Sequence, residues 1–116
     1  MKAYERLLKY VTYATASDES CLCCPSTSRQ LDFARALADE MNIIGVSNTR
    51  VDSNGYVYGK IPANITGEPS IGFIAHMDVS PDAPSENIRT IITPNYDGGI
   101  IKRPFGDLDP QNMTEL

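Results

Sequence analysis

The sequence is most informative through what it lacks. It has no tryptophan, only three phenylalanines and a single histidine, so any core rests on aliphatic side chains and tyrosine. One zinc ion takes about three or four protein ligands, and a lone histidine cannot supply them. No apolar run approaches the roughly 20 residues that span a bilayer, and the charged N-terminus has no continuous apolar segment of the kind a secretory signal needs. We therefore expect a cytoplasmic protein.

Positive charge is also scarce. The formal net charge is -5, and no basic stretch interrupts the chain. A surface of this kind repels nucleic acids and anionic membranes, so neither is expected as a partner. The 116 residues, 41% apolar and 22% charged, are typical of a globular protein and suffice for one small domain or part of a larger one.

Three cysteines stand close together as Cys21, Cys23 and Cys24. An odd number of cysteines without a secretory signal does not indicate a disulfide framework. The spacing Cys-x-Cys-Cys also differs from the Cys-x-x-Cys pair of a zinc knuckle. We expect reduced thiols in an irregular loop, with metal binding as the alternative.

Two helices are predicted in the first half of the chain. Apolar residues at helical spacing from Tyr4 to Ala14 form one stripe. A second stripe runs from Leu31 to Met41, preceded by Thr27 and Gln30 at capping-box spacing. Gly45 is placed to end this second helix in the left-handed conformation.

Strands are predicted in the remainder. Residues 49–52 and 56–61 flank Asn54-Gly55, a strong hairpin signal because both residues tolerate positive φ. The run 70–76 is apolar on both faces, which is typical of a central strand covered on both sides. A short strand is expected at 88–93. The predicted fold class is α/β, a partial α/β/α layer with two N-terminal helices, a hairpin and a central buried strand.

His76-Met77-Asp78 follows this apolar run and is the main candidate for chemistry. Alternate residues of a strand point to the same face, so His76 and Asp78 are expected to lie together. An imidazole beside a carboxylate is a common arrangement for a metal ligand and the group that orients it. The alternative is a histidine that is hydrogen-bonded for structural reasons only.

A resemblance adds to this interpretation. The run Ile71 to Asp82, with its His-x-Asp-x-Ser-Pro-Asp pattern, resembles the first metal-binding motif of the tripeptide aminopeptidases within the dizinc aminoacylase/carboxypeptidase-like (M20) metallopeptidases. Pro25-Ser26-Thr27, Ile61 to Asn64 and Asn95 to Gly99 match the same family in order. The resemblance extends from the opening helix to about Lys102.

The resemblance implies a hydrolase in which two zinc ions share a bridging carboxylate and a bridging water. It implies that His76 is a zinc ligand and that Asp78 supports its imidazole, as the catalytic carboxylate of this segment. The family's bridging Asp, its Glu-Glu pair, its later ligands and its lid domain have no counterpart here. Ile100 also stands where an acidic residue is expected.

The sequence therefore resembles the N-terminal segment of such an enzyme. Residues 1–105 are expected to form the N-terminal part of the catalytic domain, and 106–116 a polar, irregular tail. Alone, the chain is expected to be inactive and not to retain zinc. The alternatives are a segment of another M20 dipeptidase or deacylase, and a non-catalytic α/β module. Besides a short peptide substrate, self-association through an unfinished sheet is a possible interaction.

Overall fold

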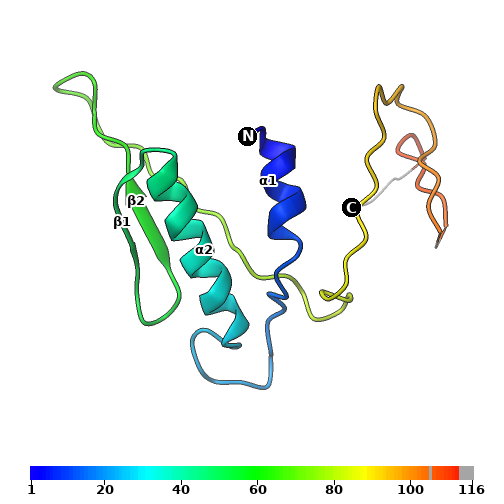
Figure 1. Ribbon diagram of the computed structural model, residues 1–116, viewed down its shortest axis with the longest axis horizontal. Coiled ribbons are helices and arrows are strands. Elements are labelled where there is room, and N and C mark those ends of the chain that lie inside the picture. The colour runs from blue at the N-terminus through cyan, green and yellow to red at the C-terminus, as the bar shows by residue number, and fades with distance from the viewer. Residues whose placement is uncertain (105, 113–116) are drawn as a thin grey trace.

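The computed structural model describes residues 1–104 and 106–112, and contains two helices and a two-stranded antiparallel sheet (Figure 1). Helix α1 spans Ala3–Tyr10, helix α2 Arg29–Ile43, strand β1 Ser47–Val51 and strand β2 Val57–Lys60. The chain is thus a small mixed α/β structure. No helix in the described ranges combines the length and apolarity needed to cross a membrane.

Helix α1 is shorter than the apolar stripe predicts. It ends at Tyr10, and the N–H groups of Thr12 and Tyr13 then donate to the carbonyls three residues back, at Lys9 and Tyr10, in the tighter bonds of a closing turn. The Glu5 carboxylate begins the helix by accepting the backbone N–H of Lys2 at 2.6 Å. No residue of α1 is buried, because only part of its apolar stripe meets the rest of the molecule.

Helix α2 begins two residues later than Thr27. The predicted capping box is wrong, because the Thr27 hydroxyl donates instead to the backbone oxygen of Ala16 at 3.1 Å. The predicted C-terminus is confirmed. Gly45 has φ of +88°, and the N–H of Val46 reaches the carbonyl of Met41 at 2.9 Å, which satisfies a carbonyl that the helix leaves open.

The predicted hairpin is confirmed. β1 pairs with β2 in a register that sets Arg50 opposite Tyr58 and Val51 opposite Val57. At the turn, one carboxylate oxygen of Asp52 accepts the N–H groups of Asn54 and Tyr56, each at 3.0 Å. Helix α2 packs on this hairpin. Close packing depends on Gly59, because a Cβ there would lie 2.3 Å from Met41 and 2.5 Å from Val46.

The small core lies where α2 meets the segment that follows α1. Phe33 and Ala34 are its only buried apolar residues in the part of the chain that the structure describes. The rings of Tyr10 and Tyr13 pack on Phe33, with centroids 5.3 and 5.0 Å away. Beside them Glu40 is buried and accepts a 2.6 Å bond from Arg6, which ties α1 to α2.

The prediction of a central buried strand at 70–76 is wrong for this structure. The segment is irregular, and the side chains of Phe73 and Ile74 are 95% and 100% exposed. A strand is stable only where neighbouring strands accept and donate its backbone hydrogen bonds. Here the hairpin is the only sheet within the described ranges, and it does not pair with 70–76. The strand predicted at 88–93 is absent for the same reason. The described residues thus show a mixed α/β piece in which α2 packs on the hairpin, and the finer α/β/α layering stays a prediction.

The orange part of the chain, from about residue 95 to 112, lies apart from the helices and the hairpin (Figure 1). Residues 106–112 contain no helix or strand, and Leu108 and Ile101 exchange two backbone hydrogen bonds. The prediction for residues 113–116, and for the boundary at Phe105, falls outside the described residues. The division into 1–105 and 106–116 stays a prediction.

Candidate metal-binding segment

The segment that carries His76 and Asp78 is anchored just beyond them. The N–H of Val79 donates to the backbone oxygen of Thr15 at 3.3 Å, and the N–H of Ser17 donates to the oxygen of Val79 at 3.1 Å. The Thr27 hydroxyl holds the intervening Ala16 from the start of α2. Segments more than sixty residues apart in the sequence thus fix the position of the His-x-Asp motif.

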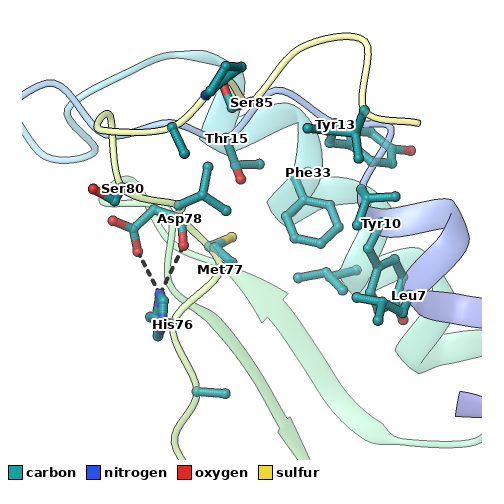
Figure 2. Close-up of a pocket in the computed structure, with 17 residues that line it drawn as sticks. Leu7, Tyr10, Tyr13, Thr15, Phe33, His76, Met77, Asp78, Ser80 and Ser85 are labelled. Atoms are coloured by element: carbon teal, nitrogen blue, oxygen red, sulfur yellow. Dashed lines mark hydrogen bonds and ion pairs between the residues drawn. The ribbon is translucent and has the colours of Figure 1, made fainter. Parts of the chain in front are cut away.

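The structure brings His76 and Asp78 together as predicted, although the segment that carries them is irregular and not a strand. Nδ1 of His76 lies 2.9 Å from the backbone oxygen of Asp78 and 3.2 Å from its Oδ1, as Figure 2 shows. Both partners are acceptors, so Nδ1 carries the proton in these bonds. In the neutral imidazole Nε2 is then left with its lone pair, the form that binds a metal.

The exposure of the two side chains agrees with a free lone pair on Nε2 of His76. The His76 side chain is 85% exposed and that of Asp78 is 42% exposed. The His76 ring is held at Nδ1 alone and stands in solvent, so Nε2 remains accessible.

Asp82 closes a turn behind the pair. The Ser80 hydroxyl donates to its Oδ2 at 2.8 Å, and its own N–H donates to the Ser80 oxygen at 3.2 Å. These bonds shape the Ser80-Pro81-Asp82 turn. Asp82 therefore supports the loop, and its carboxylate is already engaged there.

A largely apolar cavity of about 670 Å³ adjoins the pair (Figure 2). Tyr10, Tyr13 and Phe33 line one side, while Met77 and Val79 line the other. That α1 and α2 face the residues after His76 could not be predicted from the sequence, because these contacts join parts that are distant in the chain. Burial raises the pKa of the Tyr10 hydroxyl, and the Glu40 carboxylate nearby adds to the shift.

The side chains of this segment can supply only one of the ligands that a zinc site needs. His76 offers a suitable nitrogen with an orienting carboxylate, but the described residues contain no group of three or more His, Cys, Asp or Glu side chains placed to hold a metal ion. A zinc ion needs about three protein ligands even where water completes the set. The residues present can contribute one ligand to such a centre and cannot complete it.

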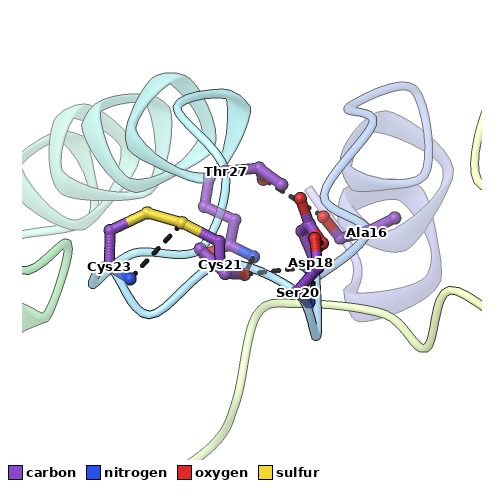
Figure 3. Close-up of a disulfide and its surroundings, with 8 residues drawn as sticks. Ala16, Asp18, Ser20, Cys21, Cys23 and Thr27 are labelled. Carbon is purple, nitrogen blue, oxygen red and sulfur yellow. Dashed lines mark hydrogen bonds between the residues drawn. A yellow bond between two sulfur atoms is a disulfide. The ribbon is translucent and has the colours of Figure 1, made fainter.

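The oxidation state of the three cysteines differs from the predicted one. Cys21 and Cys23 are joined in a disulfide (Figure 3), and only Cys24 is free. The prediction of reduced thiols is therefore wrong for two of the three. The cause is local: a bend brings Cys21 and Cys23 together, and the N–H of Cys23 points to the Cys21 sulfur. With two thiols consumed, the cluster offers no thiolate set to a metal.

No protein-family model matches this chain. Comparison with individual proteins is decisive. The chain is 47% identical to peptidase T of Aliivibrio fischeri over 115 residues, 43% identical to that of Halothermothrix orenii over 119, and 50% identical to that of Caldanaerobacter subterraneus subsp. tengcongensis over 101. The chain belongs to the peptidase T family. Its match to the first two proteins covers 97% and 99% of its own length.

The match is confined to one part of each relative. The chain spans 28%, 29% and 25% of the three peptidase T proteins, and it corresponds to their N-terminal portion. The resemblance deduced from His76, Asp78 and the flanking motifs is thereby confirmed. About seven tenths of each of these peptidase T chains lies outside the match.

Proposed function

We propose that this chain is the N-terminal segment of a zinc-dependent aminopeptidase that releases the N-terminal residue from tripeptides in the cytoplasm. His76 is the zinc ligand that this segment contributes. Asp78 fixes the imidazole so that Nε2 faces the metal. Alone, the chain lacks the ligands to hold zinc and has no peptidase activity.

The observation that carries this proposal is the His76–Asp78 geometry in a peptidase T sequence. Nδ1 is bound by two acceptors of Asp78, at 2.9 and 3.2 Å, while the ring stands exposed. A carboxylate that holds one ring nitrogen selects the tautomer and raises the basicity of the other. The anchoring of Val79 to Thr15 and Ser17 keeps this pair at a defined place on the segment.

The chemistry of each residue follows from its surroundings. His76 binds the metal, and Asp78 orients the ring and stabilises positive charge on it. When bound, zinc would polarise a peptide carbonyl and lower the pKa of a bound water. The cavity beside the pair places an apolar wall of Tyr10, Tyr13 and Phe33 next to the motif.

A second candidate function is favoured by one specific observation. The apolar segment 70–76 is exposed, which suits a non-catalytic module that self-associates through an unfinished sheet. A third candidate, another M20 dipeptidase or deacylase, shares the motif and differs only in substrate.

The test is a chimeric enzyme. This chain replaces the matched N-terminal portion of Aliivibrio fischeri peptidase T, and the purified product is assayed with a tripeptide, a dipeptide and an N-acyl amino acid. We expect release of the N-terminal residue from the tripeptide, with much slower turnover of the other two substrates. The isolated chain, assayed with added zinc, is expected to release nothing.

The matched control is the same chimera with His76→Ala. Its tripeptide activity should fall to background while its fold, followed by circular dichroism, is retained. A chimera that folds and binds zinc but prefers the dipeptide or the N-acyl substrate would support the third candidate. A chimera whose activity is unaffected by His76→Ala would refute the proposed role of this segment.

A further inference from the structure

We propose that Cys21 and Cys23 form a thiol–disulfide exchange site whose substrate is a small monothiol, neutral or cationic. In the structure these two residues are joined as a disulfide, and Cys24 beside them is free. The site lies in the loop between α1 and α2, outside the His76–Asp78 motif. It goes beyond the proposed function and does not depend on it.

The disulfide contributes little to the stability of the fold. A disulfide stabilises a protein mainly by closing a loop of the unfolded chain, and the effect grows with the length of that loop. Cys21 and Cys23 have a sequence separation of only 2, so the ring that they close is very short. Leu22 between them is fully exposed and buries no surface. The bond can therefore open without loss of core packing, and exposed disulfides of this kind are the labile ones.

The loop that carries the disulfide is closed by other bonds. The Ser26 hydroxyl accepts the N–H of Asp18 at 3.0 Å, and the N–H of Cys21 donates to the backbone oxygen of Asp18 at 3.2 Å. The Asp18 carboxylate accepts the N–H and the hydroxyl of Ser20, at 2.9 and 2.6 Å (Figure 3). None of these bonds involves a sulfur atom. We therefore expect the loop to keep its shape when the disulfide opens, so that the exchange is reversible.

The two sulfur atoms are not equivalent, and this sets the direction of attack. Cys23 is exposed, whereas Cys21 is only partly exposed. The N–H of Cys23 donates to Sγ of Cys21 at 3.3 Å (Figure 3), and such a bond stabilises a thiolate on Cys21. A stabilised thiolate is the better leaving group in disulfide exchange. An incoming thiolate therefore attacks Sγ of Cys23 and displaces Cys21.

The exchange is balanced with the small thiol, RSH, as the only co-reactant. The first RS⁻ bonds to Sγ of Cys23, the bond between the two cysteines breaks, and Cys21 leaves as a thiolate that takes up a proton. A second RS⁻ attacks the sulfur of R in this mixed disulfide and releases RSSR and the Cys23 thiolate. Two thiols are oxidised to RSSR while the protein disulfide is reduced by two electrons. An excess of RSSR reverses both steps.

Cys24 stands outside the exchanging pair. Its Sγ donates to the backbone oxygen of Asn54 at 3.6 Å, at the turn between β1 and β2. The thiol of Cys24 is thus directed to the hairpin, and its removal leaves the disulfide between Cys21 and Cys23 complete.

The charges of the loop select the kind of thiol. Asp18 and Glu19 are the only charged residues between positions 17 and 28, and both are acidic. Both are exposed and lie within three residues of Cys21. Their carboxylates attract a thiol that carries an ammonium group and repel one that carries a carboxylate. At low salt, and after correction for thiolate fraction, cysteamine should therefore react about tenfold faster than mercaptoacetate.

The test uses the whole chain with Cys24→Ser, so that only the pair can react. The protein is equilibrated with 2-hydroxyethyl disulfide, then with 2-mercaptoethanol, and then with the disulfide again. At each stage the free thiols are trapped with N-ethylmaleimide in denaturant and counted by mass spectrometry. We expect about none, two and none. Samples quenched with acid early in the reduction should carry mercaptoethanol on Cys23.

Two further variants test the selection by charge. Glu19→Gln should narrow the rate difference between cysteamine and mercaptoacetate to about threefold, because one of the two carboxylates is removed. Glu68→Gln, which alters an exposed glutamate in the loop after β2, should keep the full difference. Circular dichroism of the oxidised and reduced chains should show the same fold.

Four results would overturn the proposal. They are a pair that stays reduced in 2-hydroxyethyl disulfide, a first mixed disulfide on Cys21 in place of Cys23, equal rates for cysteamine and mercaptoacetate, and unfolding of the chain on reduction.

Discussion

At the scale of single residues, the contact between His76 and Asp78 could be predicted from the sequence. The backbone conformation that brings them together could not. The sequence predicted two side chains on one face of a strand. In the structure this segment is irregular, and both the backbone oxygen and the carboxylate of Asp78 lie within hydrogen-bond distance of Nδ1. The two residues are separated only by Met77, so local geometry suffices to join them. The role of each in binding zinc is a proposal that this geometry supports.

Other residue-level features depended on distant contacts and could not be deduced. Thr27 was expected to cap α2, yet its hydroxyl bonds to Ala16. Glu40 lies on α2 in a position that a helical pattern leaves polar, yet it is buried against Arg6 of α1. Sequence periodicity shows which faces are apolar, but it does not show which element will cover a given charged residue.

Glu40 gives a prediction on acid sensitivity. The hydrogen bond from Arg6 lowers the pKa of this carboxyl below its ordinary value of 4.5, although burial opposes the shift. A lowered folded pKa stabilises the fold above the unfolded pKa, and this contribution is lost as the pH falls through the folded pKa. Urea unfolding followed by circular dichroism should show lower stability at pH 3 than at pH 7. In Glu40→Gln the pH 7 stability should already be reduced and the difference between the two pH values smaller.

Asp32→Asn is the control for this prediction. Asp32 also pairs with an arginine of α2, Arg35, but its side chain is 69% exposed, and exposed pairs contribute little. Its stability at both pH values should follow the parent. An acid response in Glu40→Gln as large as in the parent would show that other groups cause it.

At the scale of elements, those built from local signals were predicted and those built from distant partners were not. Helix α2, its end at Gly45 and the hairpin at Asn54-Gly55 all form as expected. The strands predicted at 70–76 and 88–93 do not form. A helix satisfies its own backbone, whereas a strand needs neighbours, and the family comparison indicates that seven tenths of the relatives' sequence lies outside this match.

Gly59 gives the prediction at this scale. A methyl group there would press on Met41 and on the stiff Val46 side chain, so Gly59→Ala should lower the free energy of unfolding by about 1–3 kcal/mol. Gly72→Ala, with no atom within 4 Å of the added carbon, should change it by no more than about 0.5 kcal/mol. Urea unfolding of both variants measures the difference. Equal stabilities would show that α2 is not packed on the hairpin as described.

At the scale of the whole molecule, the chain is more open than a compact domain. Its radius of gyration is 17.8 Å, whereas a compact domain of this length has about 13 Å. Two buried apolar residues make a very small core for the described part of the chain. The composition predicted a globular protein, but composition does not reveal that segment 70–76 is exposed.

This openness predicts association of the isolated chain. Sedimentation over a concentration series should show an average mass that rises with concentration, because segment 70–76 has no cover within the described fold. The double variant Phe73→Asp, Ile74→Asp should shift the series toward the monomer. A parent chain that stays monomeric at all concentrations and unfolds cooperatively would show instead that it is a complete domain.

The central claim is that His76 binds zinc and that Asp78 orients it, and one measurement tests it most directly. Zinc content and tripeptide kinetics are determined together for the chimeric enzyme and for its His76→Ala, Asp78→Asn and Asp82→Asn variants. His76→Ala should lose zinc, because a direct ligand is removed. Asp78→Asn should keep most zinc but lose about 10–100-fold in activity, while Asp82→Asn, which alters only the turn with Ser80, should resemble the parent. Full zinc occupancy in His76→Ala, or parental turnover in Asp78→Asn, would contradict the account.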